Sequence, residues 1–179
     1  MKYIYALPFL SLLTACYTPP PLETYSMEAG SAVYSQVEKD FFLKKKIALS
    51  PITADTGSEG TNHLLSNATQ AAQTSLSKAN LLSETPDKAP YILSGKIKNV
   101  AINTCWFGTC ESGSAIEYTL TKAETTVYKD TLVVPFNYEY PAFGADMNFV
   151  YRMTQGGAIG NNFAHLIHVL TSKDQGDLK

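Results

Sequence analysis

The pattern of apolar and polar positions in the first half of the chain predicts two strands separated by a helix. An apolar run at residues 47–52 follows three lysines at residues 44–46 and precedes a polar loop, as expected of a buried strand. Residues 91–102 are rich in β-branched side chains and predict the second strand, with a bulge at Gly95. The lysines either contact anionic lipid or flank the strand in solvent, and three lysines are fewer than a lipid-binding cluster contains.

Between these strands, residues 62–82 carry the clearest helical pattern. Leucines and alanines recur every three or four positions on one face, while more polar residues occupy the rest of the surface. Thr61 or Asn62 is expected to cap the start, and Asn80 and Pro86 bracket the end. The apolar face predicts packing against a sheet.

Two further strands are predicted at residues 114–122 and 126–138. Residues 123–125 between them have the spacing of a hairpin turn. Pro135 falls within the second of these strands. Because proline cannot donate a backbone hydrogen bond, it must either end the strand or lie at the edge of the sheet.

A second amphipathic helix is predicted over residues 159–170, where apolar residues again follow helical spacing. Gly156 and Gly157 are expected to form a flexible lead into this helix, and Asn161 or an earlier polar residue is expected to cap it. The order of strand, helix, three strands and helix predicts an α+β fold, with a mostly antiparallel sheet of about four to five strands packed against two helices.

Composition fits one ordinary globular domain. The chain has 179 residues, of which 45% are hydrophobic and 17% charged, and this excludes an intrinsically disordered protein. The 14 Lys and Arg residues do not outnumber the 16 Asp and Glu residues, so no excess of positive charge is present to bind nucleic acid. We assign the single domain to residues 44–170 and a flexible polar tail to residues 171–179.

The N-terminus reads MKYIYALPFLSLLTAC, an apolar run with one charge, at Lys2. The run is too short to span a bilayer, which needs about 20 apolar residues, but it has the length of a signal-peptide core. Its last four residues, LTAC, resemble the lipobox of bacterial lipoproteins. The resemblance implies removal of the signal peptide at residues 1–15 and acylation of Cys16, with palmitate among the chains. Residues 16–43 would then be a lipidated tether and linker.

Two alternatives to the lipoprotein interpretation are a plain secretory signal with an incidental cysteine and a short buried helix. The position of Cys16 directly after the apolar run, and the YTPPP segment that follows it, favour the lipoprotein. The residue directly after the cysteine is Tyr17. An aspartate at this position would resemble the signal that retains lipoproteins in the inner membrane. The expected location is therefore the bacterial cell envelope, with the protein lipid-anchored in the outer membrane and facing the periplasm.

Cys105 and Cys110 enclose only four residues. An exported protein meets an oxidising environment, so a disulfide is the leading interpretation of this pair. A redox catalyst would be expected to show C-x-x-C spacing, and a zinc site would need further ligands. Trp106 and Phe107 lie within the loop, where they either form an exposed contact patch or pack on the disulfide.

The candidate catalytic residues are few. The histidines are His63, His165 and His168, and no serine lies in a G-x-S-x-G motif. His165 and His168 are three residues apart on the predicted helix, without a carboxylate on that helix to complete a metal site. We therefore expect no metal, no cofactor and no catalytic residue.

Several segments resemble those of small envelope lipoproteins whose domain is similar to the curli-secretion lipoprotein and the N-terminal domain of TolB. These segments are KKKIALSPI, HLLSNATQAAQTSLSKANLL and APYILSG; the part after them resembles an uncharacterised lipoprotein group through Phe143-Gly144 and the GAIGNNF segment. The loop closed by Cys105 and Cys110, and residues 160–162, depart from the pattern. The resemblance implies a fold more than an activity.

Two functions are expected from these observations. The first is a non-enzymatic envelope lipoprotein that acts as a binding or assembly component, with a protein partner, a cell-wall component or a second copy of itself bound by edge strands and by the Trp106–Phe107 loop. The second is an envelope hydrolase or transferase that uses His165 or His168 with an acidic residue. Nucleic acid is not an expected partner of either.

Overall fold

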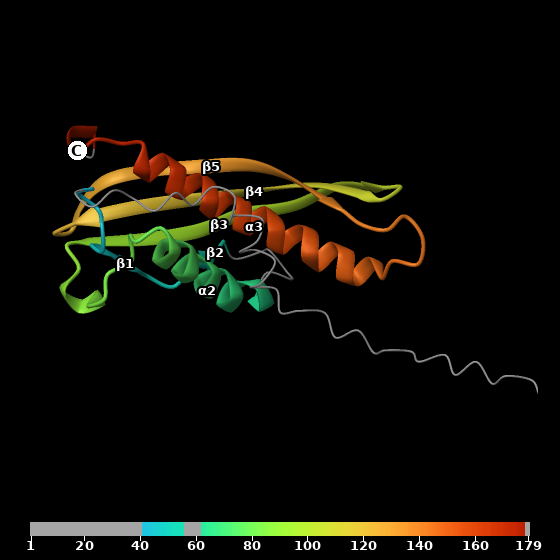
Figure 1. The fold of residues 1–179 in the computed structure, drawn as a ribbon, viewed down its shortest axis with the longest axis horizontal. Helices are drawn as coiled ribbons and strands as arrows, with labels where there is room; N and C mark the ends of the chain where they lie inside the picture. The colour runs from blue at the N-terminus through green and yellow to red at the C-terminus, as the bar shows by residue number, and fades with distance from the viewer. Residues whose placement is uncertain (1–40, 56–61, 178–179) are drawn as a thin grey trace, which may run out of the picture.

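A computed structural model of the protein describes residues 41–55 and 62–177 (Figure 1). Cys16, the signal peptide, the tether up to residue 40 and Thr61 lie outside the described residues. In chain order the elements are β1 (Ile47–Leu49), β2 (Thr53–Ala54), α2 (Asn62–Lys78), a 3₁₀ turn (Pro86–Lys88), β3 (Tyr91–Trp106), β4 (Thr109–Lys122), β5 (Thr125–Glu139), α3 (Met147–Thr171) and a second 3₁₀ turn (Gln175–Asp177).

The strands form one five-stranded, mostly antiparallel sheet, and the α+β prediction is confirmed. The strand order is β1-β3-β4-β5, with β2 also paired to β3; β1 and β2 run parallel to β3, and the three long strands are antiparallel to one another. The two helices lie together on one face of this sheet (Figure 1). None of the helices in the described part of the chain is both long enough and apolar enough to cross a membrane.

The core lies between the sheet and the two helices. Along β4 every second side chain is buried, as period-two alternation requires of a strand with one covered face. Large side chains with less than 2% exposure come from both layers, including Ile116, Tyr118 and Leu120 of β4 and Leu170 of α3. Fully burying such a side chain contributes about 1.5–3 kcal/mol, so this layer is the main source of stability.

The hairpin between β3 and β4 is longer than the sequence predicts. Phe107 and Gly108 form a two-residue turn with φ values of +40° and +96°, the backbone shape that matches the twist of the flanking strands. The cysteine segment is therefore the end of the hairpin, whereas the predicted strand stopped at residue 102. The predicted bulge at Gly95 is wrong, because the register shifts occur after Ile97 and after Ile102.

Gly95 lies close against the Ile52 side chain. Gly95 pairs in register with Tyr118 of β4, and a Cβ there would lie 2.7 Å from Cδ1 of Ile52. The residue before β2 thus packs directly on the β3 backbone.

The predicted hairpin between β4 and β5 is present with a turn one residue shorter. Ala123 and Glu124 form it with φ values of +47° and +66°, and Thr125 already belongs to β5. Beyond this turn, β5 runs past Pro135 to its end at Glu139. Because β5 is an edge strand, the edge alternative for Pro135 is confirmed.

Helix α3 begins twelve residues earlier than predicted, at Met147 against 159. The Asp146 carboxylate caps it by accepting a hydrogen bond from the backbone N–H of Asn148 at 2.9 Å. Of the two predicted alternatives, the earlier polar residue is therefore confirmed, and Asn161 lies within the helix. Gly156 and Gly157 are buried inside the helix instead of preceding it. A Cβ on Gly157 would overlap the Phe136 ring, so the glycines let α3 approach β5 closely.

Helix α2 ends at Lys78, four residues before the predicted end. Asn80 takes a left-handed φ of +60°, and the N–H of Leu81 donates to the carbonyl oxygen of Leu76 at 2.9 Å. This is the usual way in which a left-handed residue closes the last turn of a helix. Asn80 therefore lies just after the end of the helix, as the sequence predicts.

Candidate functional site

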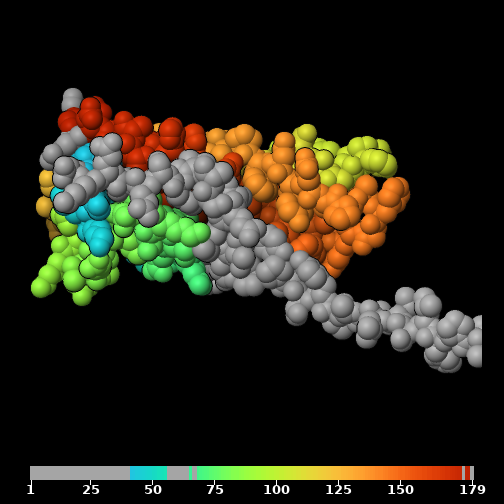
Figure 2. Space-filling view, viewed as in Figure 1, coloured from blue at the N-terminus to red at the C-terminus, as the bar shows by residue number. Residues whose placement is uncertain are grey.

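The three most exposed aromatic side chains among the described residues lie together at one end of the sheet. Trp106 at the end of β3, Phe107 of the β3–β4 turn and Phe143 of the β5–α3 segment are 78%, 73% and 83% exposed. The Phe107 and Phe143 rings meet edge to face with centroids 5.9 Å apart. Figure 2 shows the two segments, yellow-green and orange, side by side at this end. We call these three residues the aromatic tip.

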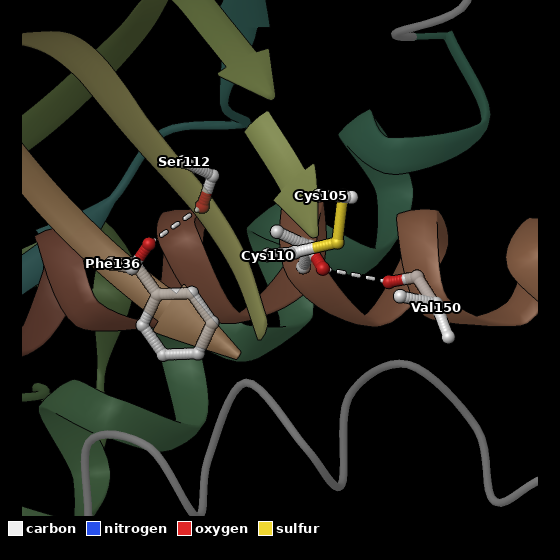
Figure 3. The surroundings of a disulfide bond; sticks show 6 residues. Cys105, Cys110, Ser112, Phe136 and Val150 are labelled. Atoms are coloured by element: carbon white, nitrogen blue, oxygen red, sulfur yellow. Dashed lines mark hydrogen bonds between the residues drawn. A yellow bond between two sulfur atoms is a disulfide. The ribbon is translucent and has the colours of Figure 1, made fainter. Parts of the chain in front are cut away.

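A disulfide lies directly behind the aromatic tip. Cys105 and Cys110 face each other across β3 and β4, with Cα atoms 4.0 Å apart, and are bonded. Cys110 is fully buried beside Val150 in the first turns of α3 (Figure 3). The disulfide therefore covers the helix-facing side of the sheet, while Trp106 and Phe107 extend into solvent.

A backbone hydrogen bond ties the turn to the β5–α3 segment. The N–H of Tyr140 donates to the carbonyl oxygen of Gly108 at 2.7 Å. A Cβ on Gly108 would lie only 3.1 Å from the Tyr140 carbonyl oxygen, and the φ of +96° at this position also favours glycine. Together with the disulfide, this contact fixes the hairpin turn against the chain that carries Phe143.

A hollow of about 300 Å³ lies beside the aromatic tip, at the junction of β5 and α3. We call it the aromatic hollow; it is lined by Tyr138, Tyr140, Pro141, Ala145, Asp146, Phe149 and Val150. Asp146 contributes its only carboxylate. Sequence reasoning missed this hollow and Phe143, although the aromatic-rich stretch at residues 136–149 was a visible signal.

Charge is unevenly distributed over the chain. The segments that build this end, residues 99–115 and 133–152, contain three acidic residues, Glu111, Glu139 and Asp146, and one basic residue, Arg152. We call this part of the molecule the acidic end.

Several lysines lie on the solvent-facing side of the sheet, where they form ion pairs. Lys96 and Lys98 pair with Asp55, and Lys98 and Lys129 approach Glu117 at 3.9 and 3.7 Å. The hydrogen bond from Lys96 is the main cause that lowers the pKa of Asp55. These pairs are exposed, and such pairs contribute little to stability.

A buried polar network joins α3 to the long strands. The side-chain amide of Asn162 donates to the carbonyl oxygens of Ser114 and Leu132 at 3.1 and 2.9 Å, and its Oδ1 accepts from the Tyr118 hydroxyl at 2.9 Å. The Ser114 hydroxyl donates to the carbonyl oxygen of Ala158 at 2.8 Å. Asn162 is completely buried, and these partners satisfy its amide, so the network serves to position α3.

The histidine pair is exposed and has no carboxylate neighbour in its depression. His165 and His168 lie with ring centroids 6.5 Å apart, beside a depression of about 220 Å³ that Val134, Asn161 and Ala164 complete. Within residues 41–55 and 62–177, no three His, Cys, Asp or Glu residues gather in a way that could hold a metal ion. His63 stands in the first turn of α2, and its side chain lies outside the described part.

No family model matches the sequence, and no curated protein matches it. Among solved structures, the chain is similar to a provisionally assigned lipoprotein from Caulobacter crescentus CB15, at 14% identity over 73% of this chain and 90% of that one, with a TM-score of 0.49. A minor lipoprotein from Acinetobacter baumannii matches at 10% identity over 72% and 92%, with a TM-score of 0.42. The hypothetical protein CT253 from Chlamydia trachomatis matches at 12% identity over 69% and 92%, with a TM-score of 0.48.

These similarities assign no family and no activity to the chain. The resemblance to the curli-secretion lipoprotein and the TolB N-terminal domain stays a prediction. Any function must therefore be argued from the residues of this protein.

Proposed function

We propose that the protein is a non-enzymatic bacterial envelope lipoprotein that binds a protein partner through its aromatic tip. The lipobox-like sequence ending at Cys16 supports a lipid anchor, and Tyr17 after it supports the outer membrane, with the domain facing the periplasm. The Cys105–Cys110 disulfide is in keeping with an oxidising compartment.

The exposure of the aromatic tip is the observation that carries this proposal. Trp106, Phe107 and Phe143 are each more than 70% exposed, although they are among the largest apolar side chains of the domain. Aromatic side chains, tryptophan above all, dominate the energetics of protein–protein contacts. The disulfide and the Tyr140–Gly108 hydrogen bond hold the backbone that presents them, so binding would cost little conformational entropy.

The start of the described chain and the aromatic tip lie at opposite ends of β3. β1, near the start of the described residues, pairs with the first three residues of β3, whereas the aromatic tip begins at the last residue of β3, Trp106. With 16 residues at about 3.3 Å each, β3 spans about 50 Å. Figure 1 places β1 and the β3–β4 turn at opposite ends of the sheet. The described part of the chain therefore begins at the end of the sheet opposite to the aromatic tip.

The edge of β5 is a weaker candidate for the contact surface. Pro135 interrupts its row of donors, and the side-chain amide of Asn161 donates to the Pro135 carbonyl oxygen at 2.9 Å. The backbone N–H of Thr131 donates to Oδ1 of Asp130 at 2.8 Å. These features hinder the addition of another strand and favour the aromatic tip as the binding surface.

Photo-crosslinking in growing cells tests the proposal. A photoreactive amino acid in place of Trp106 is expected to capture one defined envelope protein. Failure to capture any envelope protein from this position would overturn the role of the aromatic tip.

A further inference from the structure

The aromatic hollow combines aromatic rings with a carboxylate of fixed position. Tyr138 lies near the end of β5, Tyr140 follows that strand, and Phe149 lies in the first turn of α3. Asp146 closes the set, and its hydrogen bond from the Asn148 N–H holds the carboxylate at the start of the helix. At about 300 Å³, the hollow has the size of a small ligand site.

This combination suits a cation with an apolar stem. Aromatic rings attract cations to their faces, and arginine makes such contacts more often than lysine. A carboxylate beside the rings adds a charged hydrogen-bond acceptor, to which a guanidinium can donate two parallel hydrogen bonds. Tyr138, Tyr140 and Phe149 supply the rings and Asp146 the carboxylate.

The surrounding charge favours the same ligand. The acidic end contains Glu111, Glu139 and Asp146 and one basic residue, Arg152 of α3, so its net charge is negative. Glu111 and Glu139 project from the face of the sheet opposite to Tyr138, so Asp146 is the carboxylate that lines the hollow. Such a surface attracts a positively charged segment and disfavours an anionic membrane surface. The aromatic tip beside the hollow offers apolar contacts to the neighbours of a basic residue.

We propose that the aromatic hollow binds an arginine side chain of an extended segment in the protein partner, while Phe107 and Phe143 contact the apolar residues next to that arginine. The guanidinium lies against Asp146, and the stem lies among Tyr138, Tyr140 and Phe149. This inference rests on the proposed function, because it names the chemistry by which the partner is recognised.

Peptide binding to the mature chain tests this inference. A chain of residues 16–179 with Cys16→Ser has neither the apolar run at residues 1–15 nor the acylated cysteine and needs no detergent, and Trp106, the only tryptophan, reports binding at the aromatic tip by its fluorescence. The probe is an acetylated and amidated Leu-Arg-Leu peptide, compared with a peptide in which neutral citrulline replaces arginine. The arginine peptide is expected to bind saturably and at least tenfold more tightly, with chemical-shift changes in the amides of residues 138–150.

Two matched variants separate the Asp146 contact from general charge. Asp146→Asn keeps a good helix cap and removes the negative charge, so the fold persists while binding of the arginine peptide falls about tenfold. Asp87→Asn makes the same change in the exposed 3₁₀ turn Pro86–Lys88, outside the acidic end, and is expected to leave binding unchanged.

Equal binding of the two peptides, or no binding of the arginine peptide up to about 10 mM, would overturn the inference. A shift of Trp106 emission with phosphatidylcholine vesicles and not with the arginine peptide would overturn it in favour of a lipid surface. If the peptides fail while photo-crosslinking from position 106 still captures an envelope protein, the proposed function stands and only the arginine site is wrong.

Discussion

The hydroxyl of Tyr118 donates to Oδ1 of Asn162 at 2.9 Å, in the interior between β4 and α3. The same asparagine donates to two strand carbonyl oxygens, so one side chain connects the helix with β4 and β5. This connection lies within the stretch where α3 carries four small residues, Gly156, Gly157, Ala158 and Gly160. The small residues let α3 lie close to β4 and β5, and at this short distance the Asn162 amide reaches the strand carbonyl oxygens.

We predict that Asn162→Ala lowers the free energy of unfolding by about 2–4 kcal/mol. The substitution removes one buried hydrogen bond from the Tyr118 hydroxyl and one from each of two backbone carbonyl oxygens, and losing such a bond in a buried site costs about 1–3 kcal/mol, partly relieved by rearrangement. The neighbouring Asn161→Ala serves as the control. Asn161 makes one hydrogen bond at a more exposed site, so its loss is expected to cost about 1 kcal/mol or less. Urea unfolding of the two variants checks this, and equal losses would contradict it.

Removing the disulfide should loosen the aromatic tip without unfolding the domain. Replacing Cys105 and Cys110 together by alanine opens a loop whose ends are five residues apart, and the chain-entropy estimate for so short a loop is about 2 kcal/mol. The hydrophobic core lies elsewhere along the strands and is expected to stay folded.

Thermal unfolding and the hydrogen exchange of residues 103–109 measure the two effects. Faster exchange confined to the hairpin end, with a moderate loss of thermal stability, is the expected result. Global unfolding of the double variant, or unchanged exchange at the hairpin end, would show that the disulfide does not serve to fix the tip.

Alkaline pH should destabilise the protein through Tyr128. Burial is the main cause that raises the pKa of this phenol to about 12 from an ordinary value of 10.0. Because the folded state holds the proton more tightly than the unfolded chain, this contribution is complete below pH 10 and is lost as the pH rises towards 12.

Urea unfolding between pH 9 and about 12 measures this loss, with Tyr128→Phe as the control, because phenylalanine has no proton to lose. The wild-type protein is expected to lose more stability over this range than the variant. Identical slopes for the two proteins would contradict the raised pKa.

The lipid anchor has a direct test in cell fractionation. Cys16→Ser removes the thiol that acylation requires, so the protein is expected to leave the membrane fraction or to remain an unprocessed precursor. Labelling with radioactive palmitate gives a second measurement, in which only the wild-type chain is expected to carry label. A Cys16→Ser protein that is processed normally and stays with the outer membrane would disprove the anchor.

Local patterns predicted most of the fold, because the long strands and α2 carry clear periodicity. The start of α3 could not be predicted locally: Gly156 and Gly157 have the composition of a loop, and the reason for them is the Phe136 ring, which comes from another element. The sequence does predict Trp106 and Phe107 as a candidate contact patch, because they lie between two cysteines. Phe143 and the aromatic hollow were missed because only the packing of the β5–α3 segment against the hairpin brings them together.

The central claim is that the aromatic tip, and not the surface in general, binds an envelope partner. The most direct measurement is photo-crosslinking in cells from position 106 compared with position 133, because Val133 is 75% exposed but lies on β5, away from the tip. The account predicts one defined crosslinked envelope protein from position 106, absent from position 133 and lost when Phe143 is replaced by serine. The same products from both positions, or none from position 106, would contradict it.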